Sequence, residues 1–125
     1  MVKLVYAIRR REGLSAEEFS RYWLEVHAAK VVDVARDIRA LRYVQSHTID
    51  TPLNAAFTET RGLSPWYDGI TEVWWESLDD LVTAASSPEG GKALQMLHED
   101  EQQFIDFAAS TIFMTEEHEI FDRAG

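Results

Sequence analysis

The chain has 125 residues, 46% of them hydrophobic and 11% aromatic, which is enough for one domain with a single core and too little for two. Its formal net charge of −10 repels phosphate backbones and anionic lipid, so neither nucleic-acid binding nor membrane binding is expected. The absence of cysteine excludes disulfides, thiol catalysis and thiolate metal sites. No apolar run near the N-terminus is long enough for a signal or membrane segment, and we therefore expect a cytoplasmic protein.

The first two predicted elements are a strand over residues 2–9 and an amphipathic helix. Ser15 and Glu18 form a Ser-x-x-Glu capping box, which predicts that the helix begins one residue after the serine and continues into the thirties. His27 follows Trp23 by four residues, so both side chains should face whatever the helix packs on. The apolar stripe of this helix is expected to consist of Phe19, Tyr22, Trp23, Val26 and Val34.

The middle of the chain predicts two strands separated by an irregular segment. The strands are expected at about 41–49 and 67–76. Residues 50–66 contain two prolines and show no clear period, which favours a long loop. Period-two spacing places three polar side chains on one face of the earlier strand, namely Tyr43, Gln45 and His47.

The last third predicts two helices and a strand. Ser77 opens a short helix, and Ser87 caps a second helix that is expected to continue through Ala108. The final strand is expected at about 111–120. The order βαββαβ predicts one α+β domain over residues 1–125, a ferredoxin-like sandwich with an antiparallel sheet and both helices on one face.

The predicted strands are apolar on both faces, as Val5 and Ala7 alternate with Leu4 and Tyr6 in the first strand. A sheet with one face in water should instead alternate apolar with polar residues. The simplest cover for the second face is another copy of the same sheet. The sequence therefore predicts a homodimer that pairs through its sheet faces.

Several side chains are candidates for a site that exchanges protons with a small hydrophobic or aromatic ligand. His27, Tyr43, His47 and Glu72 carry titratable groups. Glu72 lies between apolar neighbours and is expected to have a perturbed pKa if it is buried. The side chains expected to contact the substrate are Tyr22, Trp23, Gln45, Trp74 and Glu101.

No recognised cofactor or metal motif occurs in the chain. The stretch Ser87–Lys92 has glycines and a lysine but lacks the spacing of a phosphate loop. His98 and Glu101 make a single His-x-x-Glu, which is too common to indicate a di-iron site. Proton chemistry without cofactor or metal, or binding alone, is what the sequence leaves.

The order and spacing of several weak motifs resemble the EthD-like family over most of the chain. These motifs are Lys3-Leu4-Val5-Tyr6, Arg9 to Ser15, Glu18-Phe19, Tyr22 to His27, Arg42 to His47, Asp68-Gly69 and Glu72 to Trp75. The resemblance implies a dimeric α+β barrel with a ligand between the helices and the sheet. It also implies that His27, Tyr43 and His47 correspond to family site residues, although relatives commonly have proline near the position of Ala29.

Three functions are compatible with this resemblance. The first is an enzyme that dehydrates, isomerises or cyclises an aromatic or alicyclic substrate, in catabolism or polyketide metabolism, with His27 as general acid or base. The second is an accessory protein that binds a hydrophobic ligand without catalysis. The third is a monooxygenase, either free of cofactor or using haem.

Overall fold

A computed structural model describes residues 1–125 and contains the predicted elements in the predicted order. Its four strands form one antiparallel sheet in the order β2-β3-β1-β4, so the first and third strands are central. This is the ferredoxin-like arrangement, and the predicted α+β fold is confirmed. The strands are β1 (Val2–Ile8), β2 (Arg42–His47), β3 (Gly69–Trp75) and β4 (Thr111–Thr115).

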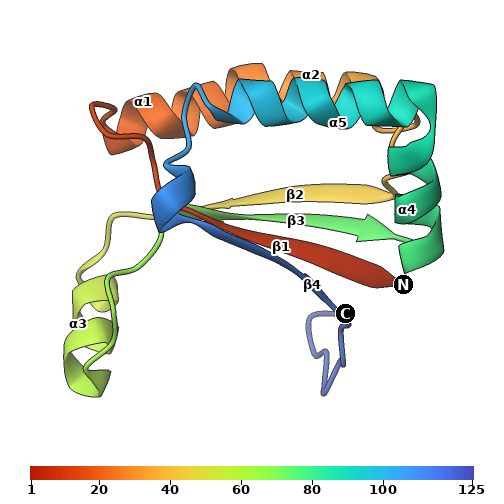
Figure 1. Ribbon diagram of the computed structural model, residues 1–125. Coiled ribbons are helices and arrows are strands. Elements are labelled where there is room, and N and C mark those ends of the chain that lie inside the picture. The colour runs from red at the N-terminus through yellow and green to blue at the C-terminus, as the bar shows by residue number, and fades with distance from the viewer.

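The long helices cover one face of the sheet (Figure 1). One continuous helical rod consists of α1 (Ala16–Arg21), the π-helical segment η1 (Tyr22–His27) and α2 (Ala28–Val34). Beside it runs α5 (Pro88–Glu101), preceded by α4 (Leu78–Ser86). The predicted serine caps are all present, since Ser15, Ser77 and Ser87 each accept a backbone N–H of the first turn. None of the helices combines the length and apolarity needed to cross a membrane.

The core between helices and sheet has two parts. One contains Val31, Ile38, Val73, Trp75, Ala93 and Leu97, and the other Ile8, Phe19, Trp23, Phe104 and Ile105. Gly69 begins β3 directly beneath the Trp23 indole, where an added Cβ would collide with the ring. Glycine at this position lets the helical rod approach the sheet closely.

Two predicted elements end five or more residues earlier than the sequence indicates. The last helix, α5, ends at Glu101 rather than near residue 108, because the next segment pairs with the chain that follows β1. There the Arg11 N–H donates to the Phe104 carbonyl at 2.8 Å, and the Asp106 N–H donates to the Arg9 carbonyl at 2.9 Å. The last strand ends at Thr115 because its partner Lys3 lies at the start of β1.

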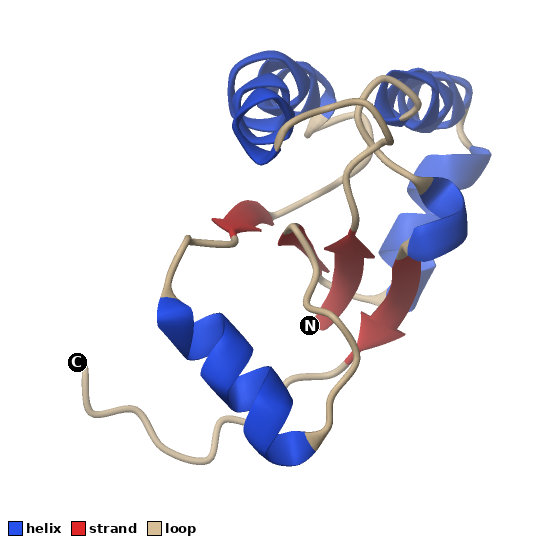
Figure 2. Ribbon diagram, turned by 90° about the vertical axis from the view of Figure 1, so that its left-hand side faces the viewer, coloured by secondary structure: helices blue, strands red, loops and turns tan.

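The predicted loop over 50–66 contains a helix, α3 (Pro52–Arg61), so that prediction is wrong. Thr51 caps it with a side-chain oxygen 3.3 Å from the Leu53 N–H, and Gly62 ends it with a left-handed φ of 60°. No residue of α3 is buried, which explains why its apolar residues form no recognisable stripe. In Figure 2, α3 and the C-terminal segment lie on the opposite side of the sheet from the long helices.

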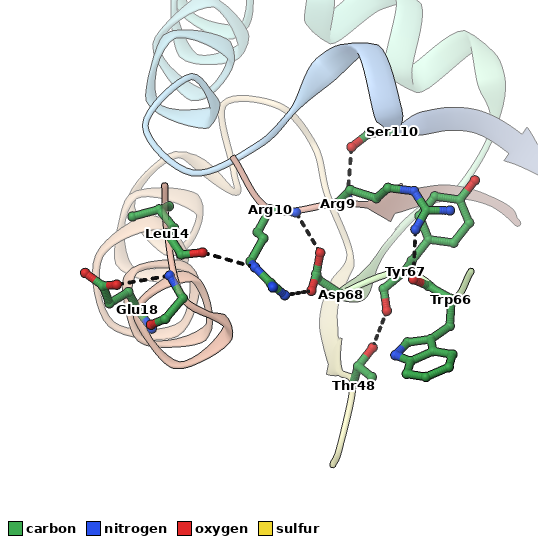
Figure 3. A network of polar contacts seen from close by, with 10 residues as sticks. Arg9, Arg10, Leu14, Glu18, Thr48, Trp66, Tyr67, Asp68 and Ser110 are labelled. Carbon is green, nitrogen blue, oxygen red and sulfur yellow. Dashed lines mark hydrogen bonds and ion pairs between the residues drawn. The ribbon is translucent and has the colours of Figure 1, made fainter. Parts of the chain in front are cut away.

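The basic run after β1 holds the return segment from α3 in place (Figure 3). The Arg9 guanidinium donates to the carbonyls of Pro65 and Trp66, each at 2.8 Å. The Arg10 guanidinium pairs with the Asp68 carboxylate at 2.6 Å. Arg9 and Arg10 therefore make structural contacts at the edge of the sheet where β1 ends.

Candidate functional site

A cavity of about 150 Å³ lies between the long helices and the sheet. Thirteen of its sixteen lining residues are hydrophobic, and apolar cavities of this size hold molecules such as benzene. Ile112 on the edge strand β4 lines the cavity and is 52% exposed, so the cavity approaches the surface at that edge. Side chains with polar atoms on the wall are Tyr6, Trp23, His27, Tyr43, Thr71, Trp75 and Glu101.

The π-helical segment keeps the buried side chains of the helical rod on one side, and three of them line this cavity: Trp23, His27 and Val31. The buried residues of the rod are Phe19, Trp23, His27 and Val31, each four positions after the one before. In an α-helix, steps of four advance about 40° past a full turn, so three steps would rotate the side chains by about 120°. A π-helical segment turns less per residue and offsets that rotation. Val26, predicted in the stripe, is 39% exposed as a result.

His27 belongs to a buried cluster centred on Asp100 of α5. The His27 Nδ1 lies 2.7 Å from one oxygen of the Asp100 carboxylate. The other oxygen accepts the Tyr22 hydroxyl at 2.6 Å and the Lys30 ammonium at 2.8 Å. Only 7% of His27 and 6% of Asp100 are exposed. The His27 Nε2 has no protein partner, and the residue lines the cavity.

The charges of this cluster favour neutral His27. Burial alone would raise the pKa of Asp100, but hydrogen bonds from Lys30, Tyr22 and His27 hold it below its ordinary value. Burial lowers the pKa of His27 below its ordinary 6.5, and Asp100 offsets only part of this effect. Because the Lys30 charge already balances that of Asp100, a proton on His27 would leave a net positive charge in a buried place. Burial and Asp100 also raise the pKa of Tyr22 to about 12.

A second pair of titratable groups lines the same cavity. The Tyr6 hydroxyl of β1 donates to the Glu101 carboxylate at 2.9 Å. Burial raises the pKa of Glu101 above its ordinary value, although the Tyr6 hydrogen bond opposes the rise. Burial, with the negative charge of Glu101, also raises the pKa of Tyr6. The cavity wall thus carries two titratable side chains with separate hydrogen-bond partners, His27 with Asp100 and Glu101 with Tyr6.

The polar face predicted for β2 is a hydrogen-bonded row. The Gln45 side-chain nitrogen donates to the Tyr43 hydroxyl at 2.7 Å and to the Trp23 carbonyl at 2.9 Å. The Gln45 oxygen lies 2.8 Å from the His47 Nε2, and the His47 Nδ1 bonds to the Ser20 hydroxyl. His47 also stacks on the Trp23 ring, with 4.2 Å between ring centroids. Of the three β2 residues, only Tyr43 lines the cavity.

Glu72 and Trp74 lie on the other face of the sheet, away from the cavity. Their neighbours Thr71 and Val73 line it, and successive strand residues point to opposite faces. The Glu72 carboxylate pairs with the Lys3 ammonium at 2.7 Å instead. The structure therefore does not bring Glu72 or Trp74 together with His27.

The structure brings some of the predicted site residues together at the cavity and places others elsewhere. Trp23, His27, Tyr43 and Glu101 line one cavity, whereas Tyr22, Gln45 and His47 hold their neighbours in place. The main omission is Asp100. Its spacing was informative, because the buried residues of α5 are Gly90, Ala93, Leu97 and Asp100. No group of three or more His, Asp or Glu side chains is placed to hold a metal ion.

A family model described as the EthD domain matches residues 11–108. An ethyl tert-butyl ether degradation (EthD) family protein from Bacillus halodurans is 19% identical, with a TM-score of 0.63 over 94% of this chain and 99% of that one. A dimeric protein of unknown function and ferredoxin-like fold from Bacteroides fragilis is 12% identical, with a TM-score of 0.58 over 93% and 95%. SnoaB, a cofactor-independent oxygenase from Streptomyces nogalater, is 13% identical, with a TM-score of 0.55 over 94% and 93%. No curated protein matches the chain.

Proposed function

The chain belongs to the EthD domain family, and from this premise we propose that it is a small enzyme that moves protons on a ring-sized apolar substrate. The observation that carries the proposal is the His27–Asp100 pair at the wall of an apolar cavity. The cavity volume of about 150 Å³ suits one six-membered ring and is too small for a porphyrin, so the proposal does not include haem. The likeness to a cofactor-independent oxygenase supports small-molecule chemistry in this fold without a cofactor.

In this proposal His27 is the general base. Asp100 accepts the Nδ1–H and thereby fixes the tautomer, leaving the Nε2 lone pair to accept a proton from the substrate. The Asp100 carboxylate then stabilises the imidazolium while the proton resides there. Glu101, whose pKa is raised by burial, is a second group that exchanges protons with the substrate. Isomerisation by a proton shift consists of such proton transfers, whereas dehydration and cyclisation combine them with loss of water from a C–O bond or with formation of a ring bond.

A direct test needs no knowledge of the natural substrate. The protein is mixed with cyclohexanone in D₂O, and NMR follows replacement of the protons next to the carbonyl. We expect exchange that saturates with ketone concentration. Saturable binding with no exchange above a protein-free control would instead favour a ligand-binding accessory protein and would refute the enzymatic proposal.

The pH dependence of this exchange should report the protonation of His27. Because the folded protein holds the pKa of His27 below 6.5, the neutral base predominates at pH 7. The rate should be constant near pH 7 and should fall as the pH decreases through a midpoint below 6.5. A rate profile measured between pH 4.5 and 8 tests this expectation, and a midpoint above 6.5 contradicts it.

We also propose that two copies pair through the face of the sheet opposite the long helices. That face carries Val5, Val44, Ile70 and Phe113, and Phe113 is 50% exposed. The likeness to a dimeric protein with the same fold supports this arrangement. In sedimentation equilibrium the protein should have twice its chain mass, and Phe113→Lys should reduce it to a monomer. Val32→Lys on the outer side of α2, where Val32 is 72% exposed, should leave the mass unchanged. A monomeric unmodified protein would refute the proposal.

A further inference from the structure

The hydrogen bonds between the helical rod and β2 have a defined direction. The Trp23 carbonyl can only accept a hydrogen bond, so the Gln45 group facing it at 2.9 Å must be the amide nitrogen. The π-helical segment shapes this contact, because the same carbonyl accepts the N–H of Ala28, five residues later. Gln45 therefore donates both of its amide hydrogens, one to the Trp23 backbone carbonyl and the other to the Tyr43 hydroxyl oxygen at 2.7 Å.

His47 completes the assignment. The Gln45 side-chain oxygen faces the His47 Nε2 at 2.8 Å, so that nitrogen must carry a hydrogen. Burial lowers the pKa of His47, which favours the neutral ring, and its Nδ1 then accepts the Ser20 hydroxyl. Gln45 and His47 therefore cannot reverse their hydrogen bonds without breaking the row. They fix the Tyr43 oxygen as an acceptor.

Two hydrogen-bond donors at the cavity wall are left without acceptors. Since the Tyr43 oxygen accepts from Gln45, its own hydroxyl hydrogen points elsewhere. The Thr71 hydroxyl lies close enough to oppose the rise that burial causes in the pKa of Tyr43, but it is not placed to accept this hydrogen in a hydrogen bond of normal geometry. The Trp23 indole N–H is completely buried and is the one buried side-chain polar atom without a hydrogen bond. Trp23 lies close enough to the Tyr43 hydroxyl to oppose the rise that burial causes in its pKa, yet forms no hydrogen bond with it. Both residues line the cavity.

A buried donor without an acceptor costs free energy, because it has lost its hydrogen bond to water without gaining another. The geometry points to a ligand oxygen as the missing acceptor. The Tyr43 hydroxyl and the Trp23 indole N–H together bind the carbonyl or phenolic oxygen of the six-membered-ring substrate. Gln45 and His47 are positioning residues for this oxygen site. The inference rests on the proposed function, since it names the substrate class of the same cavity as cyclic ketones and phenols.

The oxygen site would also serve the proton transfer. When the His27 Nε2 takes a proton from the carbon next to a carbonyl, the C–H electron pair forms a carbon–carbon double bond and the carbonyl π electrons move to oxygen. The product is an enolate held by two donors, with the proton on His27. Donors fixed in advance stabilise such developing charge more than water does, because they need not reorient. The return of that proton to another atom of the substrate completes an isomerisation.

The test compares two ligands of nearly the same shape, cyclohexanone and methylenecyclohexane, of which only the ketone accepts a hydrogen bond. The four tryptophans give four indole N–H signals in a ¹⁵N-labelled sample, and Trp23→Phe identifies one of them. Cyclohexanone should shift the Trp23 signal downfield, whereas methylenecyclohexane should not. Trp75 is an internal control, because it lines the same cavity but already donates to the Ile38 carbonyl at 2.7 Å.

Tyr43→Phe provides a second measurement. We expect it to weaken cyclohexanone binding about tenfold, as for one lost hydrogen bond, and to change methylenecyclohexane binding less than twofold. The carbonyl stretch of bound cyclohexanone should also move to higher frequency in this variant. Equal weakening of both ligands, or an unmoved Trp23 signal with bound ketone, overturns the oxygen site. Failure of both ligands to bind overturns the proposed cavity itself. The His27→Gln protein should keep the Trp23 shift, so loss of the general base alone is distinguishable.

Discussion

The His27→Gln protein is expected to lose catalysed proton exchange on cyclohexanone, with a rate about 10²–10⁴ times lower than that of the unmodified protein. Glutamine can donate its amide hydrogen to Asp100, as the His27 Nδ1 does at 2.7 Å, so the buried carboxylate keeps a partner. The amide oxygen that would face the cavity is far too weak a base to accept a proton near pH 7. NMR measurement of deuterium incorporation in D₂O, at saturating ketone, gives the rate directly.

The matched control for this substitution is His98→Gln. His98 is also an imidazole, but it is exposed on α5 and stacks on Phe107 away from the cavity. Its replacement should leave the exchange rate within about twofold of the original, as expected for an exposed side chain that is not part of the cavity wall. An unchanged rate in the His27→Gln protein would rule out the role proposed for that imidazole.

Asp100→Ala is expected to lower the free energy of unfolding by about 3 kcal/mol. The substitution removes the acceptor of three hydrogen bonds, from Tyr22, His27 and Lys30. The Lys30 side chain is 42% exposed and can turn to water, but the buried His27 Nδ1–H cannot. Most of the cost therefore comes from that orphaned donor and from the cavity left by the lost carboxylate.

Urea unfolding followed by tryptophan fluorescence measures this loss, and Glu99→Ala is the control. Glu99 precedes Asp100 on α5 but is exposed, and its only side-chain hydrogen bond is accepted from the Gln95 amide at 3.3 Å. Its removal should change the free energy of unfolding by less than about 0.5 kcal/mol. Equal effects of the two substitutions would mean that the Asp100 cluster contributes nothing particular to stability.

Capping residues predict the helices correctly where the helix is also amphipathic and buries one face. Ser15, Ser77 and Ser87 each begin a helix in the structure as the sequence indicates. Thr51 and Gly62 carry equally good start and stop signals for α3, but the helix between them buries no residue. Hydrophobic periodicity is absent from a helix without a buried face, so reasoning from that periodicity misses it.

The faces of the sheet were harder to assign than its strands. Period two correctly groups Glu72 with Trp74 and Thr71 with Val73, but it does not say which pair faces the helices. Because β3 is apolar on both faces, no polar alternation identifies the inner one. The choice depends on which face the helices cover, which is a tertiary property.

Helix phase explains why the sequence predicts a site role for Glu101 but not for Asp100. The two acidic residues are adjacent, and both have contacts in the interior, Glu101 on the cavity wall and Asp100 against the neighbouring helical rod. The sequence places Glu101 in a stripe with Leu94, Leu97 and Ile105, as though the helix continued. In the structure α5 ends at Glu101, so that stripe does not extend beyond it.

The number of residues in the π-helical segment determines how α2 is rotated about the helix axis relative to α1. Residues 16–21 and 28–34 are ordinary α-helix on either side of it, and each half could tolerate substitutions that keep its own apolar face. The relative rotation of the two halves instead depends on the wider turns between Tyr22 and His27. Loss of a single residue there would leave the composition of the helix almost unchanged. It would nevertheless rotate all the side chains that follow by about 100° about the helix axis. Substitutions of the residues between Trp23 and His27 should therefore be tolerated better than insertions or deletions there.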